Sequence, residues 1–357
     1  MKRLFLVLLL VLLAAQPVLA ARAKIATLAA DPYLSALVMD ADTGEILVDE
    51  NSGAVAYPAS VLKLMVLYVV LDRIAQGSLR LDEMVQVTRE ASRMGGSQVY
   101  LDPQEQFSVD DLLYALIIQS ANDAAVALAV HAAGSKDAFV VLMNEKAKEL
   151  GMNNTSFYSV HGLPPSEGQQ PDSTTARDMA ILARELAKNP EVFKYTSTRE
   201  REFRGGEFIM RTHNKLLASV DGCDGFKTGY FKAAGFSIVA TAKRNGVRII
   251  AVVLGSLDRK VRDAKTSELL AIGFAKAKPR PEPQAVLQKA AASPAPQTAP
   301  APPAEQQSMA AEKKQESATS LGRDLMMIGL GFGAGLLACI IVAMVRSRPR
   351  SRRRRLM

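Results

Sequence analysis

The sequence contains few residues that could form disulfide bonds or bind metals. Among its 357 residues are two cysteines, three histidines and no tryptophan. Cys339 lies in a hydrophobic segment near the C-terminus and Cys223 in the body of the chain, so we expect no intramolecular disulfide bond. The histidines are far apart and no His-Glu-x-x-His motif is present. Because zinc sites need ligands at characteristic spacings, a zinc enzyme is disfavoured, and no metal or cofactor is predicted.

The sequence also has little net charge away from its two ends. Its formal charge is +8, but Lys2 and Arg3 open the chain and seven arginines lie between Arg346 and Arg355. The rest of the chain is close to neutral. A folded region that binds phosphates needs a strongly positive surface, so nucleic-acid binding is not predicted.

The first twenty residues have the pattern of a secretory signal peptide. Two basic residues precede an apolar run over 4–15, and small residues end the segment at Val18-Leu19-Ala20. The apolar run is too short to cross a bilayer comfortably. We therefore predict that residues 1–20 are removed and that the remaining chain is exported. The alternative is an uncleaved membrane anchor.

The composition changes sharply after Pro279. Residues 279–324 are rich in proline, alanine, glutamine and glutamate, which is typical of a flexible linker. Residues 325–345 form an uncharged apolar stretch long enough to span a bilayer as a transmembrane helix, and the arginine-rich segment 346–357 follows. By the positive-inside rule the arginines stay in the cytoplasm, so the body of the chain lies on the outer face of the membrane. The alternative, a basic tail for nucleic acid, is hard to reconcile with the adjacent span.

Residues 24–276 alternate helical and strand-like patterns without repeats, which predicts one α/β or α+β domain. Two β-hairpins are expected, one joining 35–39 to 45–48 and the other joining 236–242 to 247–254. Hydrophobic periodicity and capping residues predict helices over 112–119, 122–131, 174–186 and 267–274.

One short motif places a lysine where a helix would favour an acid. In Ser60-Val61-Leu62-Lys63, the lysine follows the serine by three residues and stands in an otherwise apolar run. Residues three apart share a helix face, so the amine and the hydroxyl should be neighbours. Burial lowers the pKa of a lysine, and a neutral amine could accept the proton of the serine. The alternative is that Ser60 caps the helix and Lys63 reaches solvent.

Two further motifs complement the first. Ser120-Ala121-Asn122 lies between two expected helices, where its side chains could project into a cleft, although a capping role would also explain it. Lys227-Thr228-Gly229 precedes the second hairpin. On an edge strand, these residues offer a positive charge, a hydroxyl and room for the backbone of a ligand. An exposed lysine in a glycine turn is the simpler alternative.

The three motifs, in the order Ser-x-x-Lys, Ser-x-Asn and Lys-Thr-Gly, are typical of serine penicillin-binding proteins. From about Ser35 to Phe274 the sequence resembles the low-molecular-mass D-alanyl-D-alanine carboxypeptidases, through YPASVLKLM, SANDAAVALA, NTSFYSVHGL and GCDGFKTGYF. The resemblance implies an α+β fold of the β-lactamase/transpeptidase type. In that fold a five-stranded antiparallel sheet is flanked by helices, and a mostly helical lobe carries the Ser-x-Asn motif.

The resemblance also implies a role for each matching residue. Ser60 would attack the carbonyl carbon between two D-alanines of a peptidoglycan stem peptide, with Lys63 as general base, and β-lactams would acylate the same serine. Ser120 would pass a proton to the leaving D-alanine. The oxyanion hole would be made by the backbone N–H groups of Ser60 and Tyr230. The residues that bind substrate would be Asn122, which would hold both Lys63 and the substrate amide, together with Lys227, Thr228, Gly229 and Arg262.

Three other functions remain open. A DD-endopeptidase that cuts peptidoglycan cross-links would use the same residues. A class A-like β-lactamase needs a loop glutamate, and Glu167 lies in the loop 164–172 without the Glu-x-x-Leu-Asn pattern. A non-catalytic cell-wall-binding module would not need all three motifs intact.

The sequence departs from the family in several places. Many members carry a second β-rich domain and an amphipathic anchor, whereas here a linker and a membrane span are predicted. These segments would hold the catalytic domain on the periplasmic face of a bacterial inner membrane. The sequence does not indicate whether the protein has protein partners. Cys223 stands where an aliphatic residue is commoner, and a small buried hydrophobe is the favoured interpretation. His161 and His213 are interpreted as structural, and His161 lies on a loop that could border the cleft.

Overall fold

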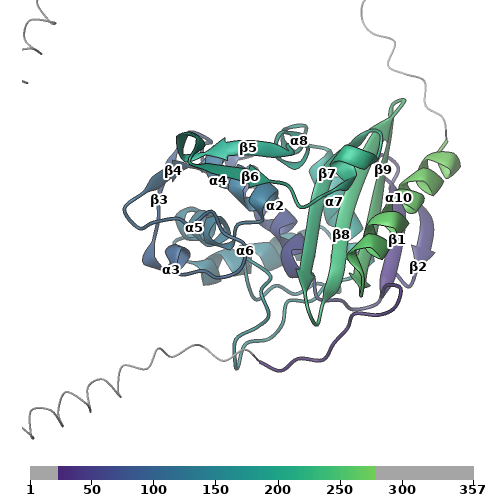
Figure 1. The fold of residues 1–357 in the computed structure, drawn as a ribbon, viewed down its shortest axis with the longest axis horizontal. Coiled ribbons are helices and arrows are strands. Elements are labelled where there is room, and N and C mark those ends of the chain that lie inside the picture. The colour runs from purple at the N-terminus through teal and green to yellow at the C-terminus, as the bar shows by residue number, and fades with distance from the viewer. Residues whose placement is uncertain (1–22, 279–357) are drawn as a thin grey trace, which may run out of the picture. The chain divides into compact units, whose positions relative to one another are not determined.

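The computed structural model describes residues 23–278 (Figure 1). The predicted catalytic domain, 24–276, falls within this range. The predicted signal peptide (1–20), linker (279–324), membrane span (325–345) and arginine-rich tail (346–357) lie outside the described residues, as does Cys339.

The described residues are built around a five-stranded sheet in the order β2-β1-β9-β8-β7. Every neighbouring pair in it is antiparallel, as predicted. Both predicted hairpins are present, and β7, which carries the Lys-Thr-Gly motif, is an edge strand. The strands are β1 (Ser35–Asp40), β2 (Ile46–Glu50), β7 (Cys223–Phe231), β8 (Gly235–Arg244) and β9 (Val247–Ser256).

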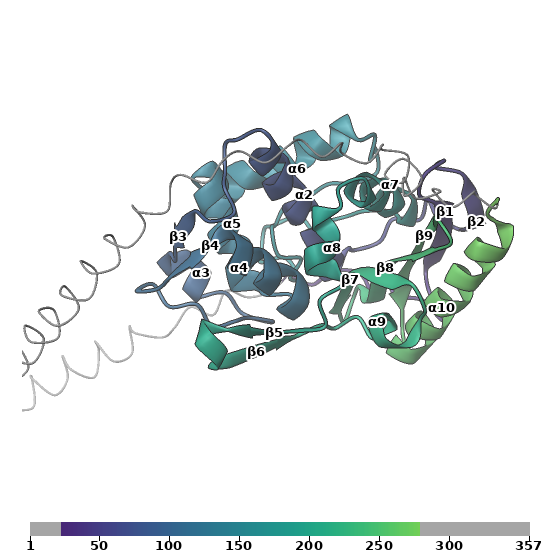
Figure 2. The same ribbon diagram turned by 90° about the horizontal axis from the view of Figure 1, so that it is seen from above.

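The sheet is covered on both faces, so its central strands β1, β9 and β8 are buried along almost their whole length. Alternate residues of a strand point to opposite faces. Accordingly, Leu37 and Met39 of β1 join the larger core, together with residues of α2 (Lys63–Ala75) and α7 (Ala176–Ala187). Ala36 and Val38 join a second core with α10 (Arg259–Lys276). Figure 2 shows α10 on one side of β8 and β9 and α7 on the other.

Beside the sheet lies a mostly helical lobe (Figure 1). Its main helices are α4 (Val109–Tyr114), which continues as a π-helical turn (Ala115–Gln119), α5 (Asn122–Ala133) and α6 (Lys136–Glu149). Two small hairpins border it, formed by β3 (Met84–Gln86) with β4 (Gln106–Ser108) and by β5 (Glu200–Phe203) with β6 (Phe208–Arg211). The short elements are the 3-10 turns Ala59–Leu62 and Arg204–Gly206, α3 (Arg89–Ser92), α8 (Glu191–Thr196) and α9 (Leu216–Ser219).

All four predicted helices exist, but some begin at other residues. The last helix begins eight residues before the predicted start at 267, because the side chain of Asp258 accepts hydrogen bonds from the backbone of Lys260 and Val261. The hydroxyls of Ser108 and Thr175 cap α4 and α7 in the same way.

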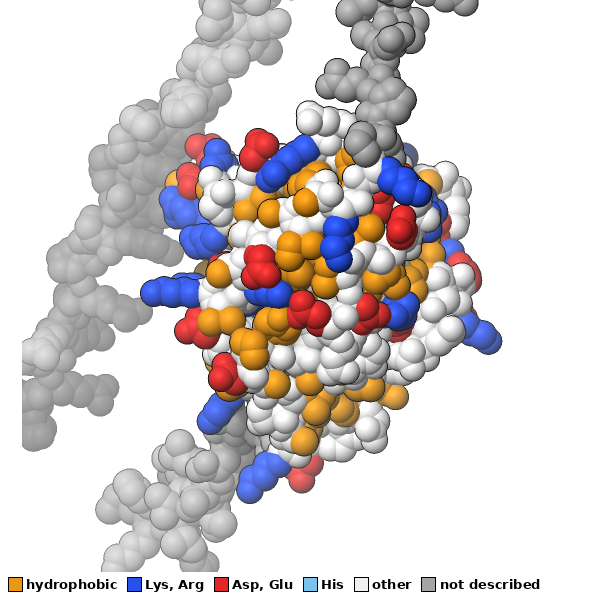
Figure 3. Space-filling model, turned by 90° about the vertical axis from the view of Figure 1, so that its right-hand side faces the viewer, with side chains coloured by type: hydrophobic (Ala, Val, Ile, Leu, Met, Phe, Trp, Pro, Cys, Tyr) orange, Lys and Arg blue, Asp and Glu red, His pale blue; other side chains and the backbone are white. Residues whose placement is uncertain are grey.

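In residues 23–278 no single helix is both long and apolar enough to cross a membrane; one bent pair, α5 with α6 at 84°, meets the criteria by length and composition alone. The face that carries α10 and β2 shows acidic and basic side chains interspersed among apolar ones (Figure 3).

Candidate active site

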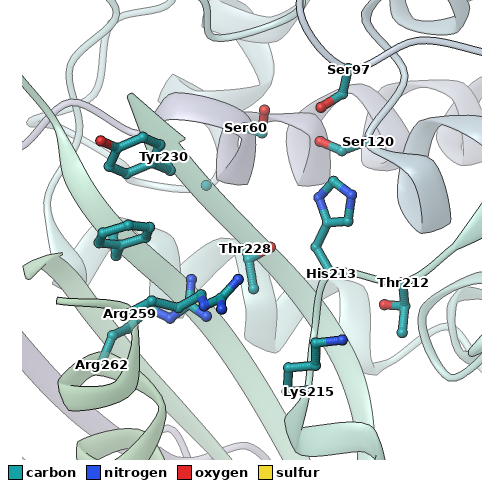
Figure 4. A pocket seen from close by; sticks show the side chains of 12 residues that line it. Ser60, Ser97, Ser120, Thr212, His213, Lys215, Thr228, Tyr230, Arg259 and Arg262 are labelled. Atoms are coloured by element: carbon teal, nitrogen blue, oxygen red, sulfur yellow. The ribbon is translucent and has the colours of Figure 1, made fainter. Parts of the chain in front are cut away.

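A cavity of about 410 Å³ lies where the edge strand β7 meets the helical lobe (Figure 4). Six of the predicted site residues line it: Ser60, Ser120, Thr228, Gly229, Tyr230 and Arg262. The other three, Lys63, Asn122 and Lys227, are buried behind its wall. The cavity is also lined by residues that the sequence did not single out as catalytic or substrate-binding: Ser97, Thr212, His213, Lys215, Phe236 and Arg259.

Lys63 is fully buried, and its amine contacts three oxygen atoms. The Nζ atom lies 3.0 Å from Ser60 Oγ, 2.7 Å from Asn122 Oδ1 and 2.7 Å from the backbone oxygen of His161. The 3-10 turn Ala59–Leu62 precedes α2, and Ser60 lies within this turn and makes no capping hydrogen bond. The alternative in which Ser60 caps a helix and Lys63 reaches solvent is therefore wrong.

The contacts of Lys63 define the direction of proton transfer. Burial lowers the pKa of Lys63 well below the usual value for lysine, and the nearby Lys227 lowers it further. A neutral amine has two N–H donors and one lone pair. The oxygens of Asn122 and His161 can only accept hydrogen bonds, so they take both donors. The lone pair therefore faces the Ser60 hydroxyl, which is the arrangement that a general base requires.

The Ser120-to-Asn122 segment forms a sharp turn between the π-helical turn and α5. Ser120 has a left-handed backbone, with φ of 61°, and its side chain lines the cavity. Asn122 is buried, and its side-chain amide donates to the backbone oxygen of Gly95 at 2.7 Å while its oxygen accepts from Lys63. Asn122 therefore holds Lys63 in place; its predicted contact with the substrate amide stays a prediction.

Lys227 is also buried, and its Nζ donates to the backbone oxygen of Thr228 at 3.0 Å. Burial, together with the charge of Arg262, lowers the pKa of Lys227 to about 7. A bound carboxylate would raise this pKa, because opposite charges favour the ammonium form. Lys227 is thus able to become fully charged as an anionic ligand binds.

Gly229 lies directly against the turn that carries Ser60. A Cβ atom at this position would lie 2.8 Å from the backbone oxygen of Pro58, 2.9 Å from the backbone nitrogen of Ser60 and 3.0 Å from that of Val61. Real Cβ atoms essentially never approach backbone this closely. Only glycine therefore lets β7 pack so close to the nucleophile.

Replacing Gly229 by alanine is expected to slow acylation of Ser60 by at least about 10²-fold. The strand must move away from Ser60, and small displacements of the oxyanion donors cost that much. The rate of acylation by a fluorescent penicillin measures the effect. Gly53→Ala is a matched control, since no atom lies within 4 Å of its Cβ position. Acylation of both variants at the wild-type rate would contradict the packing argument.

Arg262 and Tyr230 line the cavity in different ways. Arg262 is buried, and its guanidinium donates to Asp263 Oδ1 from Nε at 2.9 Å and from a second nitrogen at 2.5 Å. Much of its charge is therefore balanced within the protein. The Tyr230 ring is exposed and stacks on Phe236, with ring centroids 4.1 Å apart.

Sequence reasoning did not identify Asp172, which supports the base from a distance. Its buried carboxylate accepts hydrogen bonds from the backbone of Tyr158 and Ser159 and from the Ser159 hydroxyl. These bonds fix the loop whose His161 carbonyl accepts from Lys63. Burial raises the pKa of Asp172 to about 6, although its hydrogen bonds and Lys63 favour the carboxylate. The SVHGL sequence was part of the family resemblance, but no pattern in it indicates a buried acid partner.

The structure also places the residues whose roles were left open. Cys223 is partly buried at the start of β7, packs against the α10 core and has a pKa raised to about 11 by burial, which fits a small hydrophobe. The His161 ring accepts from the backbone of Leu163. His213 lines the cavity (Figure 4), where desolvation and nearby basic side chains lower its pKa to about 4. Within residues 23–278, no cluster of three or more His, Cys, Asp or Glu side chains could hold a metal.

Comparison with known proteins gives matches that cover most of the described residues. The family model described as D-alanyl-D-alanine carboxypeptidase, Peptidase S11, matches residues 20–257. The chain is 38% identical over 245 residues to the D-alanyl-D-alanine carboxypeptidase DacF of Bacillus subtilis, covering 68% of this chain and 62% of that protein. It is 39% identical over 246 residues to DacC of Escherichia coli, covering 67% of this chain and 60% of that protein. The chain thus spans less than two thirds of the length of these curated relatives.

Solved structures show the same fold. Penicillin-binding protein D2 of Listeria monocytogenes, in an ampicillin-bound form, is 32% identical with a TM-score of 0.62, covering 68% of this chain and 98% of that one. The carboxypeptidase DacD of Francisella tularensis is 30% identical with a TM-score of 0.64, covering 74% of each chain. These matches confirm the predicted α+β penicillin-binding fold. The chain therefore belongs to the D-alanyl-D-alanine carboxypeptidase family of serine peptidases, Peptidase S11.

Proposed function

We propose that this protein is a serine D-Ala-D-Ala carboxypeptidase, which removes the terminal D-alanine from peptidoglycan stem peptides through an acyl-enzyme. The observation that carries the proposal is the contact of Lys63 with Ser60. A buried amine lies 3.0 Å from the hydroxyl, and its two N–H groups are taken by carbonyl oxygens. This arrangement directs the lone pair of the amine toward the Ser60 hydroxyl at the cavity wall, which a purely structural lysine would not require.

The acylation step follows from this geometry. Ser60 Oγ attacks the carbonyl carbon between the two D-alanines as Lys63 takes its proton, and the backbone N–H groups of Ser60 and Tyr230 stabilise the oxyanion. The C–N bond then breaks. Ser120, at the cavity wall, passes the proton to the leaving amine. The product is an ester of Ser60 and a free D-alanine.

The terminal carboxylate of the substrate binds beside Thr228. Thr228 and Arg262 both line the cavity, and the buried Lys227 lies behind the cavity wall. Release of D-alanine leaves room for water, which Lys63 deprotonates as it attacks the ester. Hydrolysis frees Ser60 and completes the cycle.

β-Lactams would acylate Ser60 and remain attached, because their leaving group is tethered to the acyl group. The Listeria relative has been crystallised in ampicillin-bound and cefotaxime-bound forms. The family membership and the cavity beside Ser60 together support the same reaction in this chain.

Product analysis tests the proposed activity. The purified protein should release D-alanine from a pentapeptide faster than it cleaves cross-linked dimers. Preference for the dimers would instead identify a DD-endopeptidase, and rapid turnover of penicillin would identify a β-lactamase. The latter is disfavoured because Glu167 is exposed and does not line the cavity. A non-catalytic wall-binding module would release no product from any of these substrates.

We also propose that the catalytic domain is exported and held on the outer face of the bacterial inner membrane. The proposal rests on the predicted signal peptide, the apolar stretch 325–345 and the arginines that follow it. A protease added outside spheroplasts is then expected to remove the domain and to leave the arginine-rich tail intact. A domain that is protected until the membrane is broken would refute this orientation.

A further inference from the structure

The cavity beside Ser60 carries more positive charge than one substrate carboxylate needs. Its lining includes Lys215, Arg259 and Arg262 and no aspartate or glutamate among the described residues. Lys227 adds a fourth basic side chain directly behind the wall. A D-Ala-D-Ala peptide brings a single carboxylate to this region, so at least one cation is left without a counter-ion when it binds.

The two arginines of the cavity differ in their partners. The buried Arg262 is paired with Asp263, with 2.5 Å between the closest atoms. Arg259 lies one turn earlier in α10, is exposed, and forms no ion pair with any residue from 23 to 278. In Figure 4 the overlapping side chains of Arg259 and Arg262 extend from α10 toward Thr228. The positive charge of Arg259 is therefore available to a ligand.

Lys215 approaches the same region from the other wall. It immediately precedes α9, is exposed, and likewise forms no ion pair within the described part of the chain. In Figure 4 it lies on the side of Thr228 opposite to Arg259. Two available cations thus flank the position where the terminal carboxylate of the substrate would bind. The charge of Lys215 lowers the pKa of His213, and the charge of Arg259 lowers the pKa of Arg262. The positive potential of both side chains therefore reaches into the cavity.

We propose that Arg259 and Lys215 form a second carboxylate subsite, which makes the enzyme favour peptides whose leaving residue carries an additional carboxylate. The inference rests on the proposed function, because that function puts the leaving residue beside Thr228. Arg262, Lys227 and Thr228 bind the terminal carboxylate, and Arg259 or Lys215 binds the second one.

Two peptides that differ only in the leaving residue test the subsite. One ends in D-Ala-D-Ala and the other in D-Ala-D-Glu, with the same acyl group. In the wild-type protein the ratio of kcat/KM for D-Glu over D-Ala is expected to fall as salt is added. Arg259→Gln and Lys215→Gln should each lower the ratio by about 1.4-fold to fivefold, since exposed charge pairs contribute about 0.2–1 kcal/mol. The loss should appear in KM rather than in kcat.

Lys260→Gln is the matched control. Lys260 is the next residue of α10, is exposed and does not line the cavity, so its removal takes away an equal charge without changing the ratio. A double variant at positions 259 and 215 with the wild-type ratio would overturn the subsite. So would an equal drop of the ratio in the Lys260 variant, which would indicate a general charge effect.

The proposed function and the subsite fail in different ways. If the wild-type protein releases neither D-alanine nor D-glutamate, the proposed function is wrong. The two peptides are then compared by calorimetric binding to the Ser60→Ala protein, which does not turn over substrate. The D-Glu peptide should bind more tightly, and the double variant should bind both peptides equally. Equal binding of both by the Ser60→Ala protein would overturn the subsite.

Discussion

Replacing Ser60 by alanine is expected to abolish covalent labelling by a fluorescent penicillin and to reduce D-alanine release by at least about 10⁴-fold. Loss of the nucleophile removes the covalent route entirely, and losses of this size are typical of serine hydrolases. The hydroxyl lies at the cavity wall and makes no capping hydrogen bond, so its removal should leave the fold intact. Labelling in a gel and D-alanine release from a pentapeptide measure the two effects.

An exposed serine provides the control for Ser60→Ala. Ser78 follows α2, is exposed and does not line the cavity, so Ser78→Ala should label and turn over as the wild-type protein does. A melting temperature close to wild type confirms that Ser60→Ala is folded. Covalent labelling that persists in this folded variant would show that another residue is the nucleophile.

The sequence predicts the chemical pair better than the rest of the site. The three-residue spacing of Ser60 and Lys63 implies proximity, and the apolar run around Lys63 implies burial. Both expectations agree with the structure, in which Lys63 is fully buried beside Ser60. Local spacing and local composition determine these features, so one short motif contains enough information.

Local spacing does not predict the other contacts of Lys63, and the contact with Asn122 was expected only from the family resemblance. Asn122 is 59 residues away and His161 is 98 residues away along the chain. The acceptor from His161 is a backbone oxygen, which every residue has, so no residue type marks it. The same holds for Asp172, because its role follows from burial next to Ser159 and not from any local pattern.

The sequence did not indicate that Arg259 lines the cavity, for a related reason. The last helix was expected to begin at 267, which left Arg259 in an undefined segment. Asp258 caps the helix and starts it at Arg259, although the first turn contains no acidic residue after the cap. The earlier start puts Arg259 and Arg262 on one face, three residues apart, beside the edge of the active-site cavity.

Replacing Lys63 by arginine is expected to slow acylation of Ser60 by about 10²- to 10⁴-fold, the usual contribution of a general base. Arginine keeps the positive charge but has no lone pair to offer at any accessible pH. In the wild-type protein, the lowered pKa of Lys63 keeps the amine neutral above that pKa, so kcat/KM should fall as the pH drops through it. The pH profile of kcat/KM for the arginine variant should show no such fall at low pH, and raising the pH should not restore activity.

Lys63→Met separates the loss of a base from a disturbed fold. Methionine is unbranched, neutral and about as long as lysine, so it suits a fully buried position in an apolar helix. If Lys63 acts as the base, a folded methionine variant should be as slow as the arginine variant, because neither side chain can accept the Ser60 proton. Wild-type acylation in either folded variant would exclude Lys63 as the base. Such a result would reduce Lys63 to a buried donor for Asn122 and His161, a role that requires N–H groups and not a lone pair.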